Sequence, residues 1–333
     1  MLSSSSSALC DAYDLAMLDL DGVVYVGPDA VPGAAEHLAA AREAGMGVAF
    51  ITNNASRPPD AVATHLSDLG VPATVDDVVT SAQAAAAVLA ERLGKGAPVV
   101  LLGGVGLEVA LAERGLRAVG VDDEAEAVVS GYGPDVRWGD IMRAAVRIRD
   151  GLWWVASNTD GTIPTPFGVA PGHGVLVDTV RRFAGVEPVV AGKPERPLLD
   201  ETVRRMGGER PLMVGDRLDT DIAGAHRVGV DSLLVLTGVS GLEELVAATP
   251  DERPTYVGLD LRALSQPQPA PEQEGGVWVL SDQRAEVVDG ALQVTGEGEP
   301  ADWWRVVAAA GWAWLDETGR AADTNGLAAP TAS

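Results

Sequence analysis

Short apolar runs alternate with amphipathic helical segments in this chain, and this alternation restricts the fold more than any other feature. The first stretch has an apolar run at 15–21, a helical pattern at 31–45 and a second apolar run at 46–54. A buried strand, a helix and another buried strand are typical of a parallel sheet with helices on both faces. We therefore predict an α/β fold whose core is a doubly wound parallel sheet.

The same pattern resumes after residue 185. Its strands and helices are predicted at 188–194, 195–207, 210–216, 219–228, 231–238 and 255–261. Between the two stretches lies another α/β set, with apolar runs at 98–104, 127–133 and 152–158. A domain inserted into the core explains this order most economically. We expect a core over 11–81 and 187–264, interrupted by an inserted domain over 82–186.

The end of the chain has a different composition. Residues 265–276 are rich in Pro, Gln and Glu and lack hydrophobic periodicity, which predicts a linker. Short strands and a Trp-rich helix are expected beyond it, and they predict a small α+β accessory domain over 277–320. Because few contacts cross a linker, we expect removal of 266–333 to leave the chemistry of the core in place.

Composition and charge exclude several classes of protein. The 333 residues are 47 % hydrophobic and 22 % charged, which excludes wholesale disorder. The formal net charge of −24 disfavours nucleic acid and anionic membranes as partners. Cys10 is the only cysteine, and no apolar run is long enough to span a membrane. We expect a soluble cytoplasmic protein.

Four polar clusters each follow a separate predicted strand. They are DLDGV at 19–23, TNN at 52–54, GKP at 192–194 and GDRLDTD at 215–221. In an open parallel sheet ligands bind outside the carboxyl ends of the strands, so all four clusters are expected to meet at one crevice. Each cluster alone has an ordinary explanation as a solvated turn or a helix cap, but four in this arrangement favour a functional site.

The acidic clusters point to a divalent cation. Asp19 and Asp21 are two residues apart on an extended segment and point the same way, while Gly22 permits a sharp turn. Asp216 and Asp221 add carboxylates from another strand end. Carboxylates held close together repel one another unless a cation lies between them, and Mg²⁺ prefers oxygen ligands.

The other two clusters supply groups that bind phosphate. Thr52 offers a hydroxyl, Asn53 and Asn54 offer amides, and Lys193 offers a positive charge. Only two of the 24 basic residues are lysines, and the second, Lys95, lies in a predicted turn. Lys193 is therefore the lysine expected at the site.

These four clusters resemble motifs one to four of the haloacid dehalogenase superfamily, over about residues 14–262. The insertion resembles the C2-type cap of its 4-nitrophenylphosphatase and phosphoglycolate phosphatase branch. The strings FITNNASRP, VAGKPERPLL and MVGDRLDTDIAGA are similar to that branch, and within it to the glycerol 3-phosphate phosphatases of actinobacteria. Val23 stands where the superfamily more often has threonine, as is frequent in this branch.

The resemblance implies a role for each motif residue. Asp19 would be the nucleophile that attacks phosphorus, and Asp21 the general acid and then the general base. Mg²⁺ would be held by Asp19, Asp216 and the main-chain carbonyl of Asp21, with Asp221 supporting the metal site. Thr52 and Lys193 would bind phosphoryl oxygens, and Asn53 would help to position the phosphoaspartate.

The substrate is expected to be selected by the inserted domain. The Gly- and Pro-rich segment 157–174 follows a predicted strand, and its His173 would either touch the leaving group or form a hydrogen bond in the hinge. A homodimer through the inserted domain is also expected.

Several functions stay open at this point. Glycerol 3-phosphate is the first candidate substrate, and phosphoglycolate, nucleotide monophosphates and pyridoxal phosphate are the alternatives. A phosphoacceptor signalling module or a non-catalytic metabolite sensor would belong to a different class. The acid/base position of Asp21 and the long insertion favour a phosphoric monoester hydrolase.

Overall fold

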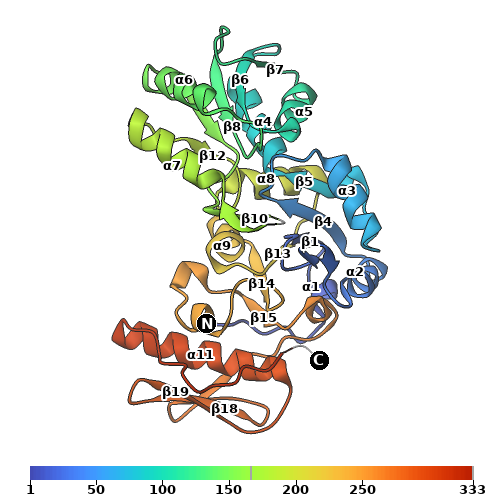
Figure 1. Ribbon diagram of the computed structural model, residues 1–333. Helices are drawn as coiled ribbons and strands as arrows, with labels where there is room; N and C mark the ends of the chain where they lie inside the picture. Colours follow the sequence, from blue (N-terminus) through green and yellow to red (C-terminus); the bar gives the residue numbers. More distant parts are fainter. Residues whose placement is uncertain (166, 332–333) are drawn as a thin grey trace. The chain divides into compact units, whose positions relative to one another are not determined.

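The computed structural model describes residues 1–165 and 167–331, which fold into two compact units. The first unit comprises Met1–Val48 and Gly208–Ser333, and the second comprises Ala49–Gly207 (Figure 1). Both units are α/β structures with parallel strands, so the predicted fold class is confirmed.

The first unit contains four parallel strands in the order β15-β14-β13-β1. They are β1 (Leu15–Leu18), β13 (Pro211–Gly215), β14 (Asp231–Val235) and β15 (Tyr256–Gly258). Its helices are α1 (Leu9–Ala12), α2 (Ala34–Glu43), α9 (Ala223–Val228) and α10 (Leu242–Val246), with shorter helical turns η2 (Leu218–Ile222), η3 (Pro250–Glu252) and η4 (Leu261–Ser265). A small hairpin, β2 (Tyr25–Val26) and β3 (Asp29–Ala30), follows the first motif. All four residues of β1 are buried, as expected for a strand covered on both faces.

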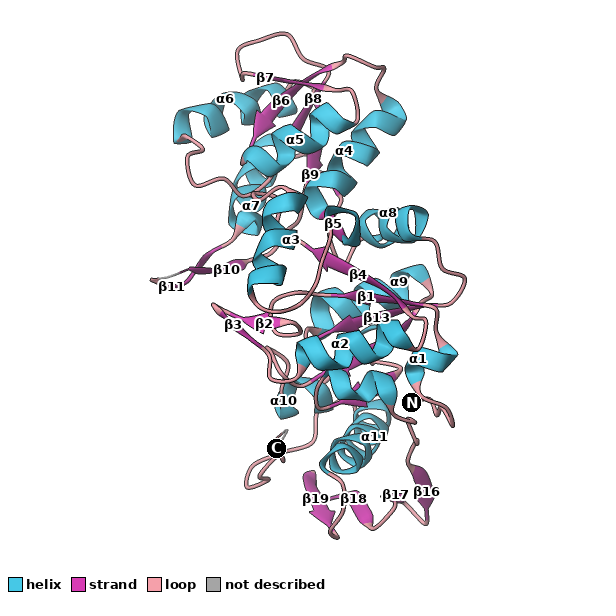
Figure 2. Ribbon diagram, turned by 90° about the vertical axis from the view of Figure 1, so that its right-hand side faces the viewer, coloured by secondary structure: helices cyan, strands magenta, loops and turns pink. Residues whose placement is uncertain are grey.

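The end of the chain forms an antiparallel meander covered by one long helix. The elements are β16 (Glu272–Glu274), β17 (Val277–Leu280), β18 (Gln283–Val288), β19 (Ala291–Thr295) and α11 (Pro300–Thr318). Figure 2 shows α11 beside these strands. The predicted strands and helix of this region are confirmed. No helix in the described part of the chain, α11 included, is long and apolar enough to cross a membrane.

This terminal region is built into the first unit. Trp303, Trp304 and Trp312 of α11 belong to one hydrophobic cluster with Leu234 of β14 and Leu245 of α10. These three tryptophans therefore pack into the core of the first unit. The expectation that few contacts join the terminal region to the rest is wrong.

A buried arginine makes the same connection with polar contacts. The Arg305 guanidinium donates to the Val257 carbonyl of β15 at 3.2 Å, to Asp302 at 3.1 Å and to the Gln268 side chain at 2.6 Å. Gln268, which falls in the predicted linker, is only 1 % exposed, and its amide also donates to the Ala263 carbonyl. Composition predicts a solvated linker here, because composition does not show which polar side chains form buried hydrogen bonds.

The second unit contains a five-stranded parallel sheet in the order β12-β9-β8-β6-β7. Its strands are β6 (Pro98–Leu102), β7 (Arg117–Val119), β8 (Ala127–Ser130), β9 (Trp153–Ala156) and β12 (Val189–Val190). Its helices are α3 (Pro59–Asp68), η1 (Val75–Asp77), α4 (Ser81–Arg92), α5 (Val105–Glu113), α6 (Trp138–Arg149), α7 (His173–Ala184) and α8 (Arg196–Met206). Strand β4 (Gly47–Thr52) runs into this unit and pairs in parallel with β5 (Val78–Thr80), and β10 (Thr162–Thr165) forms a hairpin with β11 (Gly168–Pro171).

One predicted strand belongs to a different sheet. The run at 188–194 was expected in the core, but β12 pairs with β9 of the inserted set, with Val189 opposite Val155. The expectation for this strand is wrong, and the GKP cluster follows a strand of the five-stranded sheet. Two apolar residues are too short a signal to choose between two parallel sheets.

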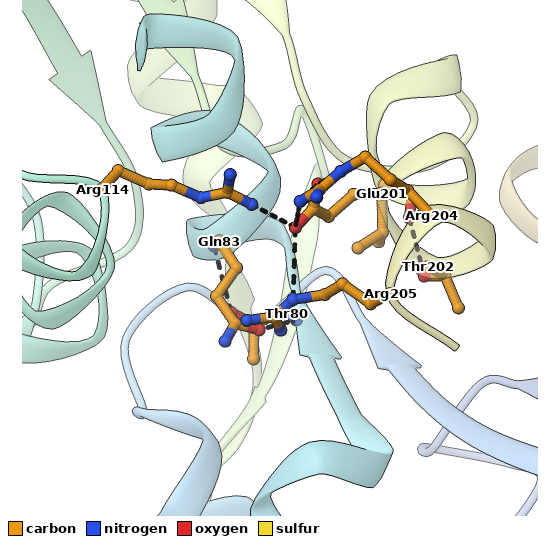
Figure 3. A network of polar contacts seen from close by, with 8 residues as sticks. Thr80, Gln83, Arg114, Glu201, Thr202, Arg204 and Arg205 are labelled. Carbon is orange, nitrogen blue, oxygen red and sulfur yellow. Dashed lines mark hydrogen bonds and ion pairs between the residues drawn. The ribbon is translucent and has the colours of Figure 1, made fainter. Parts of the chain in front are cut away.

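A buried carboxylate fixes helix α8, which follows the GKP cluster. Glu201 is 5 % exposed and accepts hydrogen bonds from Arg204 on its own helix and from Arg114 at the end of α5 (Figure 3). Arg205 forms an ion pair with the same carboxylate at 3.2 Å. These contacts join α8 to α5 within the second unit, and thereby help to hold the segment that carries Lys193.

Candidate active site

Three aspartates of the first unit form a cluster at the carboxyl ends of two neighbouring strands. Asp19 follows β1, Asp216 follows β13, and Asp221 lies in the π-helical turn η2. Because β1 and β13 pair in parallel with Leu18 opposite Val214, their ends meet at the same edge. One carboxylate oxygen from each aspartate lies within 4.8 Å of the other two.

Glycines make room for Asp216. A Cβ atom on Gly22 or on Gly238 would lie 2.5 Å from Cγ of Asp216, which is closer than any real side-chain contact. Gly22 also has a φ of +85°, a left-handed conformation that favours glycine. The DLDGV motif therefore requires its glycine for two reasons, the turn and the close approach of Asp216.

Main-chain donors orient the two buried carboxylates. Asp216 and Asp221 are both 0 % exposed. The Val239 amide donates to Oδ2 of Asp216 at 2.7 Å, and the Arg217 amide donates to Oδ2 of Asp221 at 3.1 Å. The Thr237 hydroxyl donates to the Gly22 carbonyl, so the loop after β14 supports both motifs. Sequence reasoning missed this supporting role, although TGVSG (237–241) stands at the end of the strand predicted at 231–238.

The acid cluster fits a hard divalent cation. Three carboxylates, two of them enclosed, concentrate negative charge that is costly without a compensating cation. Their oxygens are the ligands that Mg²⁺ prefers. Asp21 is exposed, and among the described residues its side chain is not in the cluster. Its main-chain carbonyl as a metal ligand stays a prediction.

The second unit holds the residues predicted to bind phosphate. Thr52 ends β4, is 6 % exposed and accepts a hydrogen bond from the Asn54 amide at 3.1 Å. Lys193 is 2 % exposed, and its amide donates to Oδ1 of Asn53 at 2.8 Å. The structure thus brings together the TNN and GKP clusters, which are separated by about 140 residues of sequence.

Sequence reasoning missed three residues around Asn53. The Ser81 hydroxyl and the Asn158 amide each donate to the Asn53 carbonyl at 2.6 Å, and Asp160 accepts from the Asn53 side chain at 2.9 Å. Asn158 and Asp160 follow β9, so they carry the same signal as the other clusters: polar residues at a strand end. Within the Gly- and Pro-rich segment 157–174, composition does not single these two residues out.

His173 is enclosed at the start of α7. It is 4 % exposed, and burial lowers its pKa to about 4 because the imidazolium ion loses its hydration. The side chain is therefore neutral at physiological pH. Both roles expected for it, a contact with the leaving group and a hydrogen bond in the hinge, stay predictions.

A parallel α/β fold with an acid cluster at its strand ends is typical of proteins that use a metal ion in phosphoryl transfer. A family model for haloacid dehalogenase-like hydrolases matches residues 16–117, and a second for HAD-hydrolase-like proteins matches residues 190–264. The chain belongs to the haloacid dehalogenase-like hydrolases.

Individual relatives are phosphatases. The chain is 44 % identical to the D-glycerol 3-phosphate phosphatase of Mycobacterium tuberculosis over 78 % of its own length and 73 % of the relative. It is 36 % identical to the acid sugar phosphatase of Staphylococcus saprophyticus over 75 % and 95 % of the two chains.

Solved structures agree with these relatives. The crystal structure of the M. tuberculosis glycerol phosphate phosphatase in complex with magnesium matches with a TM-score of 0.84 at 42 % identity, over 92 % of each chain. That match includes most of the terminal region. The 4-nitrophenylphosphatase of Thermotoga maritima matches with a TM-score of 0.72 at 30 % identity, over 77 % of this chain and 98 % of the other.

Proposed function

We propose that this chain is a Mg²⁺-dependent phosphatase that hydrolyses glycerol 3-phosphate through an aspartyl phosphate on Asp19. The observation that carries the proposal is the cluster of Asp19, Asp216 and Asp221, enclosed by glycines, in a chain 44 % identical to a D-glycerol 3-phosphate phosphatase. Residues 82–186 act as the cap that selects the substrate. Phosphoglycolate, nucleotide monophosphates and pyridoxal phosphate are the alternative substrates, and the acid sugar phosphatases among the relatives add sugar phosphates.

The proposed reaction has two steps. A carboxylate oxygen of Asp19 attacks phosphorus, the bond from phosphorus to the alcohol oxygen breaks, and protonated Asp21 gives its proton to the departing alkoxide. Asp21 then takes a proton from the water that attacks the phosphorus of the aspartyl phosphate. The bond from phosphorus to the Asp19 oxygen breaks, inorganic phosphate leaves, and the Asp19 carboxylate and protonated Asp21 are regenerated. The exposure of Asp21 suits a group that exchanges protons with substrate and water.

The remaining residues are proposed to neutralise and position the phosphoryl group. Mg²⁺ would be held by Asp19, Asp216 and the main-chain carbonyl of Asp21, with Asp221 in support, and when bound it supplies positive charge for the phosphoryl oxygens. Lys193 and Thr52 bind phosphoryl oxygens, and Asn53 holds its loop. The burial of the Lys193 side chain strengthens its electrostatic effect, because little water screens it.

The lysine assignment predicts unequal effects for the two lysines of the chain. Lys193→Met keeps most of the apolar stem and removes the charge, so kcat/KM should fall about 10²- to 10³-fold. Lys95→Met is the matched control: Lys95 is exposed between α4 and β6, and its loss should leave kcat/KM within about twofold of wild type. Equal effects at the two positions in steady-state assays would rule out Lys193 as the phosphate ligand.

The metal assignment predicts that chelation stops turnover. Dialysis against EDTA should remove activity, and Mg²⁺ should restore it. Ca²⁺ should fail to restore it and should inhibit in the presence of Mg²⁺. Ca²⁺ takes more oxygen ligands at longer distances, and if Asp19 bound it with both oxygens, neither would be free to attack phosphorus. Undiminished hydrolysis by the chelated enzyme would contradict the assignment.

A panel of esters tests the substrate. We would compare kcat/KM for glycerol 3-phosphate, phosphoglycolate, a nucleotide monophosphate, pyridoxal phosphate and a sugar phosphate, all with Mg²⁺. Glycerol 3-phosphate should exceed the others by about tenfold or more. A higher value for another ester would replace the substrate while keeping the enzyme. Failure to hydrolyse any of them, or 4-nitrophenyl phosphate, would favour a sensor or a phosphoacceptor module.

We further propose a homodimer through the cap. Helices α6 and α7 border an apolar groove of about 770 Å³, and Trp138, Met142 and Phe183 at this groove are 62 %, 56 % and 53 % exposed. Burying such a patch against a second copy would remove it from water. Sedimentation velocity should show a dimer for the wild type and a monomer for Met142→Glu. A monomeric wild-type protein at micromolar concentration would contradict the proposal.

We also propose a cytoplasmic location. Cys10 is the only cysteine and is buried, so the chain forms no internal disulfide, as is usual in a reducing compartment. A net charge of −24 disfavours nucleic acids and anionic membranes, so a small phosphate ester is the proposed partner.

A further inference from the structure

The side chain of Asn53 forms hydrogen bonds with two other segments of the second unit. Its Oδ1 accepts from the Lys193 amide at 2.8 Å, and its Nδ2 donates to the Lys193 carbonyl at 3.0 Å. The other Nδ2 hydrogen is donated to Oδ1 of Asp160 at 2.9 Å. Both hydrogens of the amide are therefore used, and the pattern of donors and acceptors fixes its orientation.

We propose that Asp160 is a positioning residue for phosphate binding, acting on Lys193 through Asn53. Asp160 holds the Asn53 amide, and that amide holds the main chain of Lys193 on both sides of its Cα atom. The direction in which the Lys193 side chain leaves the chain is thereby set by the loop after β9. This inference rests on the proposed role of Lys193 as a ligand of the phosphoryl group.

The surrounding contacts leave this arrangement little freedom. The Asp160 amide donates to Oδ1 of Asn158 at 3.1 Å, and Asn158 donates to the Asn53 carbonyl at 2.6 Å. A Cβ atom on Gly192 would lie 2.5 Å from Oδ1 of Asn53 and 2.6 Å from the Ser157 carbonyl, so only glycine fits before Lys193. Asn53, Asn158 and Asp160 thus form a closed ring of hydrogen bonds.

Asp160 also joins this ring to the β10–β11 hairpin. Its carbonyl accepts from the Gly174 amide at 2.8 Å, and the Gly161 carbonyl accepts from the Gly172 amide at 2.9 Å, so the two ends of the hairpin close directly on Asp160. Phe167 and Val169 near the tip of the hairpin are 85 % and 79 % exposed. The base of an exposed hairpin in the proposed cap is thereby connected to the phosphate-binding lysine.

A double-mutant cycle on phosphate affinity tests the proposal. Binding of inorganic phosphate in the presence of Mg²⁺ would be measured by isothermal titration calorimetry, which needs no turnover. In the wild-type background Asp160→Ala removes a charge-assisted hydrogen bond and should weaken phosphate binding about 10- to 100-fold. In the Lys193→Met background the same change should weaken it less than about threefold, because the group through which Asp160 acts is gone.

Two further variants separate positioning from folding. Asp160→Asn keeps an oxygen that accepts from Asn53, so phosphate affinity should stay within about threefold of wild type. Asn53→Asp replaces the Nδ2 donor by an oxygen that faces the acceptor oxygens of Asp160 and Lys193. Phosphate binding should therefore weaken as much as in Asp160→Ala. When Asn53→Asp is combined with Asp160→Asn, the amide at position 160 donates to the carboxylate at position 53. Phosphate affinity should then recover about tenfold relative to Asn53→Asp alone. Thr159→Ala, an exposed neighbour in the same loop, is the control and should have no effect.

Each outcome decides a different question. Equal losses for Asp160→Ala in the Lys193 and Lys193→Met backgrounds would overturn the proposal, as would unchanged affinity in the wild-type background. If Asp160→Ala does not fold, the test falls to Asp160→Asn. The proposal would then be overturned if folded Asp160→Asn lost as much phosphate affinity as Asn53→Asp. If Lys193→Met itself leaves phosphate binding unchanged, the proposed function of Lys193 fails instead.

Discussion

We expect Asp19→Asn to lose kcat by on the order of 10⁴-fold or more, equivalent to about 5 kcal/mol or more in the activation barrier. An amide does not attack phosphorus as a carboxylate does, so the covalent step is lost. The same change removes one of the three charges of the acid cluster and should weaken Mg²⁺ binding as well. Single-turnover assays at saturating Mg²⁺ would separate the loss of chemistry from the loss of metal.

The control for this substitution is another aspartate of the first unit. Asp29, in the exposed hairpin strand β3, lies outside the acid cluster, and Asp29→Asn should keep kcat within about twofold of wild type. The fold should tolerate both changes, because Asn and Asp have nearly the same shape. An Asp19→Asn enzyme that retained a tenth of the wild-type single-turnover rate would show that Asp19 is not the nucleophile.

Removal of residues 266–333 should unfold or aggregate the first unit. The truncation exposes the face of the core that Trp303, Trp304 and Trp312 cover, and it leaves the Val257 carbonyl without its donor from Arg305. Loss of a single buried tryptophan costs about 3–5 kcal/mol, and a domain is stable by only about 5–15 kcal/mol in total. The measurement is solubility and cooperative melting of the truncated chain. A soluble truncation that melts like the full chain would contradict the packing described above.

Single substitutions in α11 test the same packing without deleting the chain. Trp312 is 0 % exposed, and its indole nitrogen donates to the Leu245 carbonyl at 2.7 Å. Trp312→Ala should lower the free energy of unfolding by about 3–5 kcal/mol. Trp314 is the matched control, because it lies at the partly exposed edge of the same cluster, and its replacement by alanine should cost less than half as much. Similar losses in denaturant titrations of the two variants would argue against a shared core.

The sequence predicts those parts of this fold that have strong local signals. β1 and β13 are continuous apolar runs followed by Asp19 and Asp216, and a parallel sheet leaves few other places for such segments. Because parallel neighbours end at the same edge, the acid cluster follows from this pattern once the two strands pair. The TNN and GKP clusters were likewise predictable, because each consists of polar residues at the end of a predicted strand.

Other features depend on tertiary contacts that no local pattern contains. The two-residue strand β12 has no periodicity to show which sheet it joins. Gln268 looks like linker composition, but it is buried because Arg305 reaches it from α11. Asp221 was predicted in an ordinary helix start, whereas it lies in a π-helical turn, a form often found at functional sites. The contacts of Asp160 arise because its loop folds against Asn53, which no local pattern shows.

Trapping of the covalent intermediate tests the central claim most directly. The Asp21→Asn variant, mixed with 4-nitrophenyl phosphate and Mg²⁺, should form the aspartyl phosphate, because this leaving group needs little acid assistance, and should hydrolyse it slowly for lack of the general base. Borohydride reduces an acyl phosphate to an alcohol, so tandem mass spectrometry should find homoserine at position 19, and only when both substrate and Mg²⁺ are present. Homoserine at another aspartate, or none at all despite continuing turnover, would contradict hydrolysis through Asp19.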